Sequence, residues 1–222
     1  MLLVAVATKN EIKPLDQFLA HAERVEVLIT GMGPVVTAAS LSRHLTLHGS
    51  GVAGVINIGV AGAYLDSGVT MLDICLAQQE FLGDFGICTQ DGVQEFDPGL
   101  VKPQGPLLFN NDLSARIKSI LNSYNIGFKS VNFVTVNCST GTRKRGEYLR
   151  DKFAAGCENM EGAAAAMVCK NLNIPCVELR CVSNMVQERD IGKWRLTEAV
   201  EKMCRVAEVA LYELAQDDPD HD

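Results

Sequence analysis

Short apolar runs alternate along the chain with amphipathic segments, and few folds are compatible with this pattern. The run Leu2–Ala7 is apolar at consecutive positions, and parts of several later runs share this property. Such strands are expected where helices cover both faces of a sheet, so the pattern predicts an α/β domain. The predicted strands are Leu2–Ala7, Val25–Thr30, Gly54–Ile58, Leu72–Phe81, Lys129–Val136 and Val177–Ser183; the predicted helices are Lys13–Ala20, Pro34–His48, Asp112–Tyr124, Arg143–Phe153, Met160–Asn171 and Lys193–Ala215.

We expect one domain over residues 1–215. A chain of 222 residues is long enough for one sizeable core, and no internal repeat or low-complexity segment divides it. The stretch 83–111 is the least regular and is rich in Gly, Pro, Asp and Gln. We expect a loop there that has a function or is covered by a partner. Residues 216–222 are polar and acidic, and we expect a flexible tail.

The net charge of -7 disfavours nucleic acid and anionic membranes as partners, since both require clustered Lys and Arg. The densest basic run, Arg143–Arg145 followed by Glu147, fits a solvated helix face. The apolar start of the chain lacks a basic region and a cleavage-site pattern, so a buried strand is expected rather than a signal peptide. No apolar run approaches the ~20 residues of a membrane span.

The eight cysteines stand mostly among apolar residues, where a free thiol packs like a small apolar side chain. No Cys-x-x-Cys pair occurs and no export signal is found, so we expect reduced thiols in a cytoplasmic protein, without a disulfide framework or a zinc site. No histidine lies in a motif that would activate a thiol, which disfavours a cysteine nucleophile. The cysteines are Cys75, Cys88, Cys138, Cys157, Cys169, Cys176, Cys181 and Cys204.

The segment Glu158–Cys169 places a carboxylate, Glu161, at the start of an apolar helix rich in small residues. The helix dipole alone favours an acid there. Asn159 can cap the same helix end, however, so a second polar group before Gly162 and four alanines indicates a pocket position. Glu11 follows the first predicted strand, where a carboxylate on a rigid element can activate water. A helix-start residue is the alternative for Glu11.

Two glycine-containing turns follow predicted strands. The backbone N–H groups of Gly31-Met32-Gly33 can approach an anion or a sugar at the start of a helix. The glycines of Asn57–Ala63 leave room for a ligand at the sheet edge. A simple tight turn remains the alternative for each. A dinucleotide fingerprint is disfavoured, because Val36 stands where its third glycine is required.

The last predicted strand ends at Ser183-Asn184. An asparagine side chain presents one acceptor and two donors, which suits the edge of a heterocycle. An Asx-type turn is the alternative.

The order and spacing of these segments resemble the purine nucleoside phosphorylase/nucleosidase superfamily, in particular its methylthioadenosine/S-adenosylhomocysteine nucleosidase branch. The resemblance runs from Val4 to about Leu214. It implies a three-layer α/β/α sandwich around a twisted, mixed, partly barrel-like sheet, no metal or organic cofactor, and a homodimer or larger homo-oligomer. The residues that carry it are Glu11, Gly31-Met32-Gly33, Asn57-Ile58-Gly59-Val60-Ala61-Gly62, Met160-Glu161-Gly162-Ala163 and Arg180-Cys181-Val182-Ser183-Asn184.

Two residues distinguish the branches of the superfamily. Phosphorylases carry a phosphate-binding Arg at the position of Asn57, and without that cation water is the expected nucleophile. Adenine-releasing nucleosidases carry at the position of Asn184 an Asp that protonates the purine N7. Asparagine cannot act as an acid, but it can accept a hydrogen bond from N7–H and donate one to a 6-oxo group. This favours hypoxanthine over adenine.

The longer pattern Glu158–Ala164, followed by Ser183-Asn184-x-Val186-x-x-Arg189-Asp190 and Trp194, looks like the futalosine hydrolase family. That family cleaves futalosine to hypoxanthine and dehypoxanthine futalosine in menaquinone biosynthesis. The resemblance implies that this chain hydrolyses an N-glycosidic bond, with a small nucleoside and water as the reactants.

The resemblance also implies roles for individual residues. Glu161 binds the ribose hydroxyls with Met160 packed on the sugar, Glu11 deprotonates the attacking water, and Asn184 holds the departing base with Ser183 as its support. The two carboxylates would stabilise an oxocarbenium-like transition state. Arg189 is the candidate for the substrate's tail carboxylate, with a salt bridge to Asp190 as the alternative. The other predicted substrate-binding residues are Gly31, Gly33, Gly59, Ala61, Gly62, Ser139 and Thr140.

Three other functions remain open. A methylthioadenosine/S-adenosylhomocysteine nucleosidase is the nearest, and Asn184 speaks against it. A purine nucleoside phosphorylase is next, and Asn57 speaks against it. A non-catalytic nucleoside-binding module is disfavoured because binding alone requires no water-activating carboxylate, yet the chain keeps both Glu11 and Glu161.

Overall fold

The computed structural model describes residues 1–90, 92–102 and 105–216. Its central sheet closes on itself, because β10 (Cys176–Val186) pairs in parallel with β3 (Gly54–Tyr64) and antiparallel with β4 (Ile74–Leu82). The ring is completed through β8 (Lys129–Thr135) and β9 (Ala155–Asn159), and β1 (Leu2–Val6) and β2 (Val25–Ile29) extend the sheet beyond β3. Parallel and antiparallel pairs coexist, so the predicted mixed, partly barrel-like sheet is confirmed.

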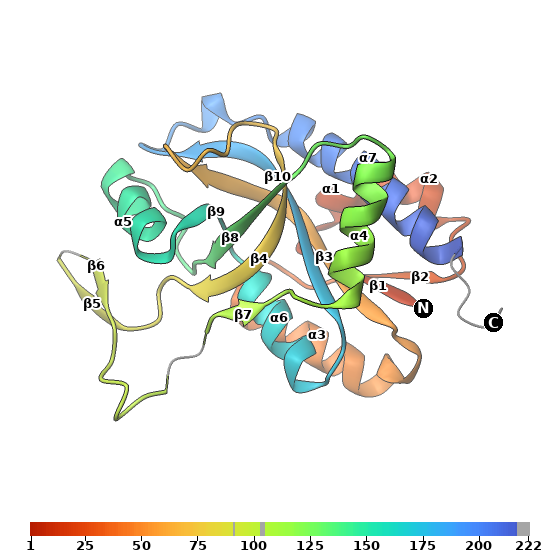
Figure 1. Cartoon of the computed structure of the whole chain (residues 1–222), viewed down its shortest axis with the longest axis horizontal. Helices are drawn as coiled ribbons and strands as arrows, with labels where there is room; N and C mark the ends of the chain where they lie inside the picture. The colour runs from red at the N-terminus through yellow and green to blue at the C-terminus, as the bar shows by residue number, and fades with distance from the viewer. Residues whose placement is uncertain (91, 103–104, 217–222) are drawn as a thin grey trace.

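Helices cover the sheet on both sides (Figure 1). One face is covered by α3 (Pro34–His48) and α6 (Gly162–Asn171), and the other by α4 (Asp112–Ser123) and α7 (Leu196–Gln216). The remaining helices are α1 (Lys9–Ile12), α2 (Asp16–Leu19), α5 (Arg143–Phe153) and the 3₁₀ turns η1 (Lys13–Leu15), η2 (Gly49–Gly51) and η3 (Ile191–Lys193). No helix in these residues is long and apolar enough to cross a membrane.

Strand β1 shows why its sequence is apolar throughout. Leu2, Val4 and Val6 belong to the core beneath α4 and α7, whereas Leu3 and Ala5 belong to the core beneath α3 and α6. Successive side chains of a strand point to opposite faces, so a strand covered on both faces needs an apolar residue at every position. The predicted two-sided burial is confirmed here.

The structure differs from the predictions in one whole strand and at several element boundaries. Strand β9 was not predicted, because its Ala-Gly-Cys-Glu-Asn sequence lacks β-branched residues and an alternation of apolar and polar residues. Its pairing with β3 and β8 stabilises the strand instead. The stretch 83–111 contains the hairpin strands β5 (Ile87–Thr89) and β6 (Gly92–Gln94) and the strand β7 (Leu107–Leu108). The last helix begins at Leu196 and ends at Gln216; residues 217–222 of the predicted tail lie outside the described residues.

Candidate active site

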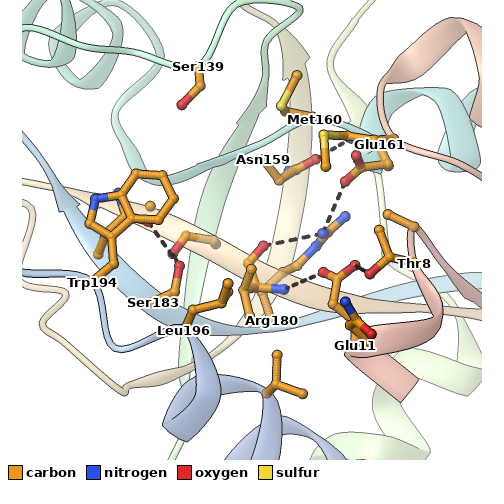
Figure 2. A pocket seen from close by; sticks show the side chains of 18 of the residues that line it. Thr8, Glu11, Ser139, Asn159, Met160, Glu161, Arg180, Ser183, Trp194 and Leu196 are labelled. Carbon is orange, nitrogen blue, oxygen red and sulfur yellow. Dashed lines mark hydrogen bonds and ion pairs between the residues drawn. The ribbon is translucent and has the colours of Figure 1, made fainter. Parts of the chain in front are cut away.

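A cavity of about 910 Å³ lies at the end of β1, along β3 and β10, beside the residues that lead into α6, and against the first residues of α7 (Figure 2). Its volume and its combination of apolar wall and few polar groups suit a nucleoside-sized ligand. Many of the predicted site residues meet here although they are far apart in the sequence. The predicted residues that line the cavity are Glu11, Ala61, Gly62, Ser139, Met160, Glu161, Ser183, Asn184 and Arg189.

Glu161 is held at the start of α6 by several polar contacts. The Asn159 side-chain oxygen accepts hydrogen bonds from the backbone nitrogens of Glu161 (2.9 Å) and Gly162 (2.7 Å), so the predicted cap is confirmed. The Glu161 carboxylate accepts from the backbone nitrogen of Gly33 (3.0 Å) and from Arg180 Nη1 (3.3 Å). Its side chain is buried apart from the edge that faces the cavity.

Glu11 stands opposite, on the short helix α1 directly after β1. The Thr8 hydroxyl donates to Glu11 Oε2 (2.8 Å), and the backbone nitrogen of Val60 donates to Oε1 (3.4 Å). Each carboxylate oxygen can accept two hydrogen bonds, so Glu11 retains acceptor capacity toward the cavity. The carboxylate is thus oriented by the protein and still able to bind and deprotonate a water molecule.

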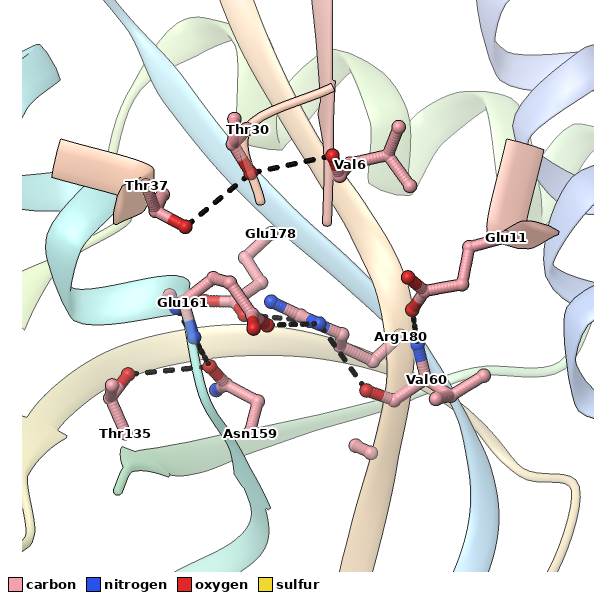
Figure 3. Close-up of polar contacts among 12 residues, drawn as sticks. Val6, Glu11, Thr30, Thr37, Val60, Thr135, Asn159, Glu161, Glu178 and Arg180 are labelled. Carbon is pink, nitrogen blue, oxygen red and sulfur yellow. Dashed lines mark hydrogen bonds and ion pairs between the residues drawn. The ribbon is translucent and has the colours of Figure 1, made fainter. Parts of the chain in front are cut away.

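Arg180 on β10 binds the Glu161 carboxylate from inside the protein, a role that the sequence did not predict (Figure 3). The side chain is 2% exposed. Its Nε donates to Glu178 (2.9 Å), Nη1 donates to Glu161 and to the carbonyl of Val60 (both 3.3 Å), and Nη2 donates to the Asn57 amide oxygen (3.1 Å). Burial lowers the pKa of Arg180, but the surrounding carboxylates outweigh burial and raise the pKa above its usual range. Arg180 therefore stays a cation.

A buried arginine within an apolar strand is a signal that could have revealed this role. Lys and Arg are almost never fully buried unless they are paired, so Arg180 required acidic partners nearby. Gly59 makes room for the pair: a Cβ atom there would lie 2.6 Å from Arg180 Nη1 and 3.0 Å from Glu11 Oε1. No larger residue fits at position 59 without displacing one of these two groups.

Four predicted substrate-binding residues lie behind the cavity wall rather than in it: Gly31, Gly33, Gly59 and Thr140. Gly33 contributes its N–H to Glu161, and the Gly31 carbonyl accepts from the Thr37 hydroxyl (3.2 Å). The backbone nitrogen of Thr140 donates to Glu158 (2.9 Å). Burial raises the pKa of Glu158, and its hydrogen bonds with Thr140 oppose part of this effect. In this structure these positions support other side chains of the site.

The other end of the cavity contains Ser183 and Trp194 (Figure 2). Asn184, the next residue of β10, also lines the cavity. The Ser183 hydroxyl donates to Asn184 Oδ1 (2.9 Å), which leaves the amide nitrogen of Asn184 as a donor. Arg189 lies 5.2 Å from the centre of the Trp194 ring, a cation–π contact. Asp190 pairs with Lys193 (3.4 Å), and no Arg189–Asp190 pair occurs among the described residues.

The chain matches the family model of the Phosphorylase superfamily over residues 11–216. It is 28% identical to the futalosine hydrolase of Thermus thermophilus, over 84% of this chain and 80% of that protein. It is 26% identical to the 5'-methylthioadenosine/S-adenosylhomocysteine nucleosidase of Mycobacterium bovis, over 77% of this chain and 73% of that protein. These names support the predicted enzyme class, a hydrolase of glycosidic bonds.

A solved structure of a futalosine hydrolase mutant from Helicobacter pylori is similar at TM-score 0.81 and 21% identity, covering 96% of this chain and 100% of that chain. The predicted nucleosidase fold is confirmed by this likeness. With the family match extending from Glu11 to the last helix, the chain belongs to the Phosphorylase superfamily.

Proposed function

We propose that this enzyme hydrolyses the N-glycosidic bond of a 6-oxopurine nucleoside, with futalosine as the substrate and menaquinone biosynthesis as the context. The observation that carries the proposal is the pairing of Ser183 with Asn184 at one end of a cavity whose other end holds Glu11, Arg180 and Glu161. The likeness to futalosine hydrolase in sequence supports the same substrate.

The carboxylate end of the cavity supplies the chemistry on the sugar. Glu161 would accept hydrogen bonds from the ribose hydroxyls, with Met160 beside it against the ring. Glu11 would orient a water molecule below the anomeric carbon and take its proton as the carbon–nitrogen bond breaks. The departing base would take up a proton from solvent, and Glu11 would return its proton to solvent, so that the sugar gains OH and the base gains H. The positive charge that develops on the sugar would be stabilised by both carboxylates, which the protein holds in place before the substrate arrives.

The hydrogen-bonding partners of Arg180 favour water over phosphate as the nucleophile. The guanidinium group has five N–H donors, and contacts to protein acceptors already engage four of them. A phosphate dianion would therefore find little free donor capacity there and would meet two carboxylates. Asn57, at the position where phosphorylases carry their arginine, serves as one of these acceptors.

Base selection would depend on Asn184. With the Ser183 hydroxyl bound to Oδ1, the amide nitrogen of Asn184 can donate to a 6-oxo group, and Oδ1 keeps a lone pair for N7–H. A 6-amino group is a donor and would face the donor nitrogen.

The Trp194 ring with Arg189 beside it would suit the carboxyphenyl tail of futalosine. The ring would stack on the phenyl group, and the arginine would pair with the carboxylate.

The test is an assay of free base released from futalosine, inosine, methylthioadenosine and S-adenosylhomocysteine, with and without phosphate. We expect hypoxanthine from futalosine at a rate independent of phosphate, and inosine to be a poorer substrate because it lacks the tail. Release of adenine as the preferred reaction would instead indicate the methylthioadenosine/S-adenosylhomocysteine nucleosidase activity, and a requirement for phosphate would indicate a phosphorylase.

A further inference from the structure

Two glutamates that do not line the cavity lie directly behind Glu161. They are Glu80 on β4 and Glu178 on β10, and both are 0% exposed. A Cβ atom at Gly162, the first residue of α6, would lie 2.1 Å from Glu80 Oε1 and 2.3 Å from Glu178 Oε2. Both carboxyl groups therefore occupy one small space beneath the start of α6, and only glycine leaves that space open.

Glu80 binds the side chain of Asn159, which in turn holds the backbone of Glu161. One Glu80 oxygen accepts from the Asn159 amide nitrogen, and the other accepts from the Thr135 hydroxyl (3.0 Å). Because the Asn159 oxygen holds the backbone nitrogens of Glu161 and Gly162, its amide nitrogen has to face an acceptor on the opposite side. Glu80 is that acceptor, so it sets the orientation of the cap.

Glu178 pairs with Arg180, the cation that binds the carboxylate of Glu161. Its Oε1 accepts from Arg180 Nε (2.9 Å), and Arg180 Nη1 donates in turn to Glu161 Oε2 (3.3 Å) (Figure 3). The other oxygen of Glu178, Oε2, is buried and receives no hydrogen bond from an N–H or hydroxyl group among the described residues. A buried acceptor left without a donor is destabilising, and more so when it is charged.

The charges around Glu80 and Glu178 favour a proton on one of the two carboxyl groups. Among the described residues, Arg180 is the cation in ion pairs with this cluster, and Glu178 and Glu161 already share it. A further carboxylate in the same dry space would have no counter-charge. Burial first, and the charge of Glu178 second, raise the pKa of Glu80 well above its ordinary 4.5. The other titratable groups that act on the pair are Glu161, Arg180, Tyr64, Cys157 and Cys176.

We propose that Glu80 and Glu178 are positioning residues that share one proton, carried by Glu80 and donated to the otherwise unpartnered Oε2 of Glu178. The neutral Glu80 holds the Asn159 cap, and the anionic Glu178 holds Arg180. The pair thereby positions Glu161 through its backbone and through its carboxylate at the same time.

The first experiment detects the proton without substrate. The infrared carbonyl band of a buried carboxylic acid is expected in the wild type at pH 7 and should be absent from E80Q, whose amide keeps a donor toward Glu178. The folded pair binds one more proton than the unfolded chain, so raising the pH destabilises the fold. From about pH 5.5 up to the pH at which folded Glu80 loses its proton, the unfolding constant of the wild type should rise about tenfold more steeply per pH unit than that of E80Q. An unchanged band, equal pH slopes, or an E80Q chain that does not fold would overturn the proposal.

The second experiment concerns catalysis and rests on the proposed function. E80Q should keep kcat and KM within about threefold of wild type, because glutamine reproduces the neutral partner. E178Q moves the negative charge away from Arg180 and should lower kcat by about tenfold or more. Equal losses in the two variants would overturn the assignment of the proton to Glu80. If no purine nucleoside is hydrolysed, the proposed function fails while the infrared and unfolding measurements still decide the pair.

Discussion

The two ends of the cavity differ in how firmly the protein holds their side chains. At the carboxylate end, Glu11, Glu161 and Arg180 each have at least two partners in the protein, and the last two are buried. At the Asn184 end, Asn184 is half-buried with Ser183 as its hydrogen-bonding partner, and Arg189 is exposed. Under the proposed function, the groups that act on the sugar are held in place before the substrate arrives, whereas those that would recognise the base and tail have fewer partners in the protein.

The largest expected effect lies at the carboxylate end. Glu11→Gln should lower kcat by about 10²- to 10⁴-fold, because the amide cannot take the proton of the attacking water. Substrate binding should be retained. The chain has one tryptophan, Trp194, and it lines the cavity, so a fluorescence titration can measure binding in the same variant. Lost binding in a folded variant would assign Glu11 to recognition instead.

A matched pair of arginine substitutions tests the comparison directly. Arg180→Met leaves Glu161 and Glu178 buried without their cation and should lower the free energy of unfolding by about 3–5 kcal/mol. Arg189→Met, at the exposed end, should change it by less than about 0.5 kcal/mol. Urea denaturation of both variants measures these values. Similar costs at the two positions would remove the distinction between the two ends.

Base selectivity should respond to Asn184→Asp. An acid at this position can protonate N7 and accept from a 6-amino group, so the ratio of kcat/KM for 6-amino over 6-oxo nucleosides should rise by about tenfold or more. Competition between methylthioadenosine and futalosine in one reaction gives this ratio. An unchanged ratio would exclude Asn184 from base recognition.

The smallest expected effect concerns the tail. Arg189→Gln should raise KM for futalosine by about tenfold, the loss of one charge-assisted hydrogen bond, with little change in kcat. Inosine, which lacks the tail carboxylate, serves as the control substrate and should keep its KM. A parallel loss for both substrates would show that Arg189 acts on Trp194 or on the fold rather than on the tail.

The sequence predicted the two-sided sheet and the meeting of Glu11, Glu161 and Asn184, because each lies at or just beyond the end of an element whose periodicity is clear. It did not predict the partners of Arg180. Gln79 and Phe81 flank Glu80, Val177 and Leu179 flank Glu178, and nothing in the sequence around Glu80 shows that it lies beside Glu178. Their closeness depends on the pairing of β4 with β10, two strands far apart in the sequence, which periodicity does not encode.

The closed ring of strands has a consequence for folding. β10 pairs with β3, more than one hundred residues earlier in the chain, and that pairing brings Arg180 beside Gly59. Contacts of such separation are slow to form, because a long loop has to close first. The cavity therefore comes into existence only when the last strand has joined the first half of the chain. During synthesis, a chain whose β10 is still inside the ribosome already contains Glu11 and Glu161, but it cannot yet form the cavity that they line.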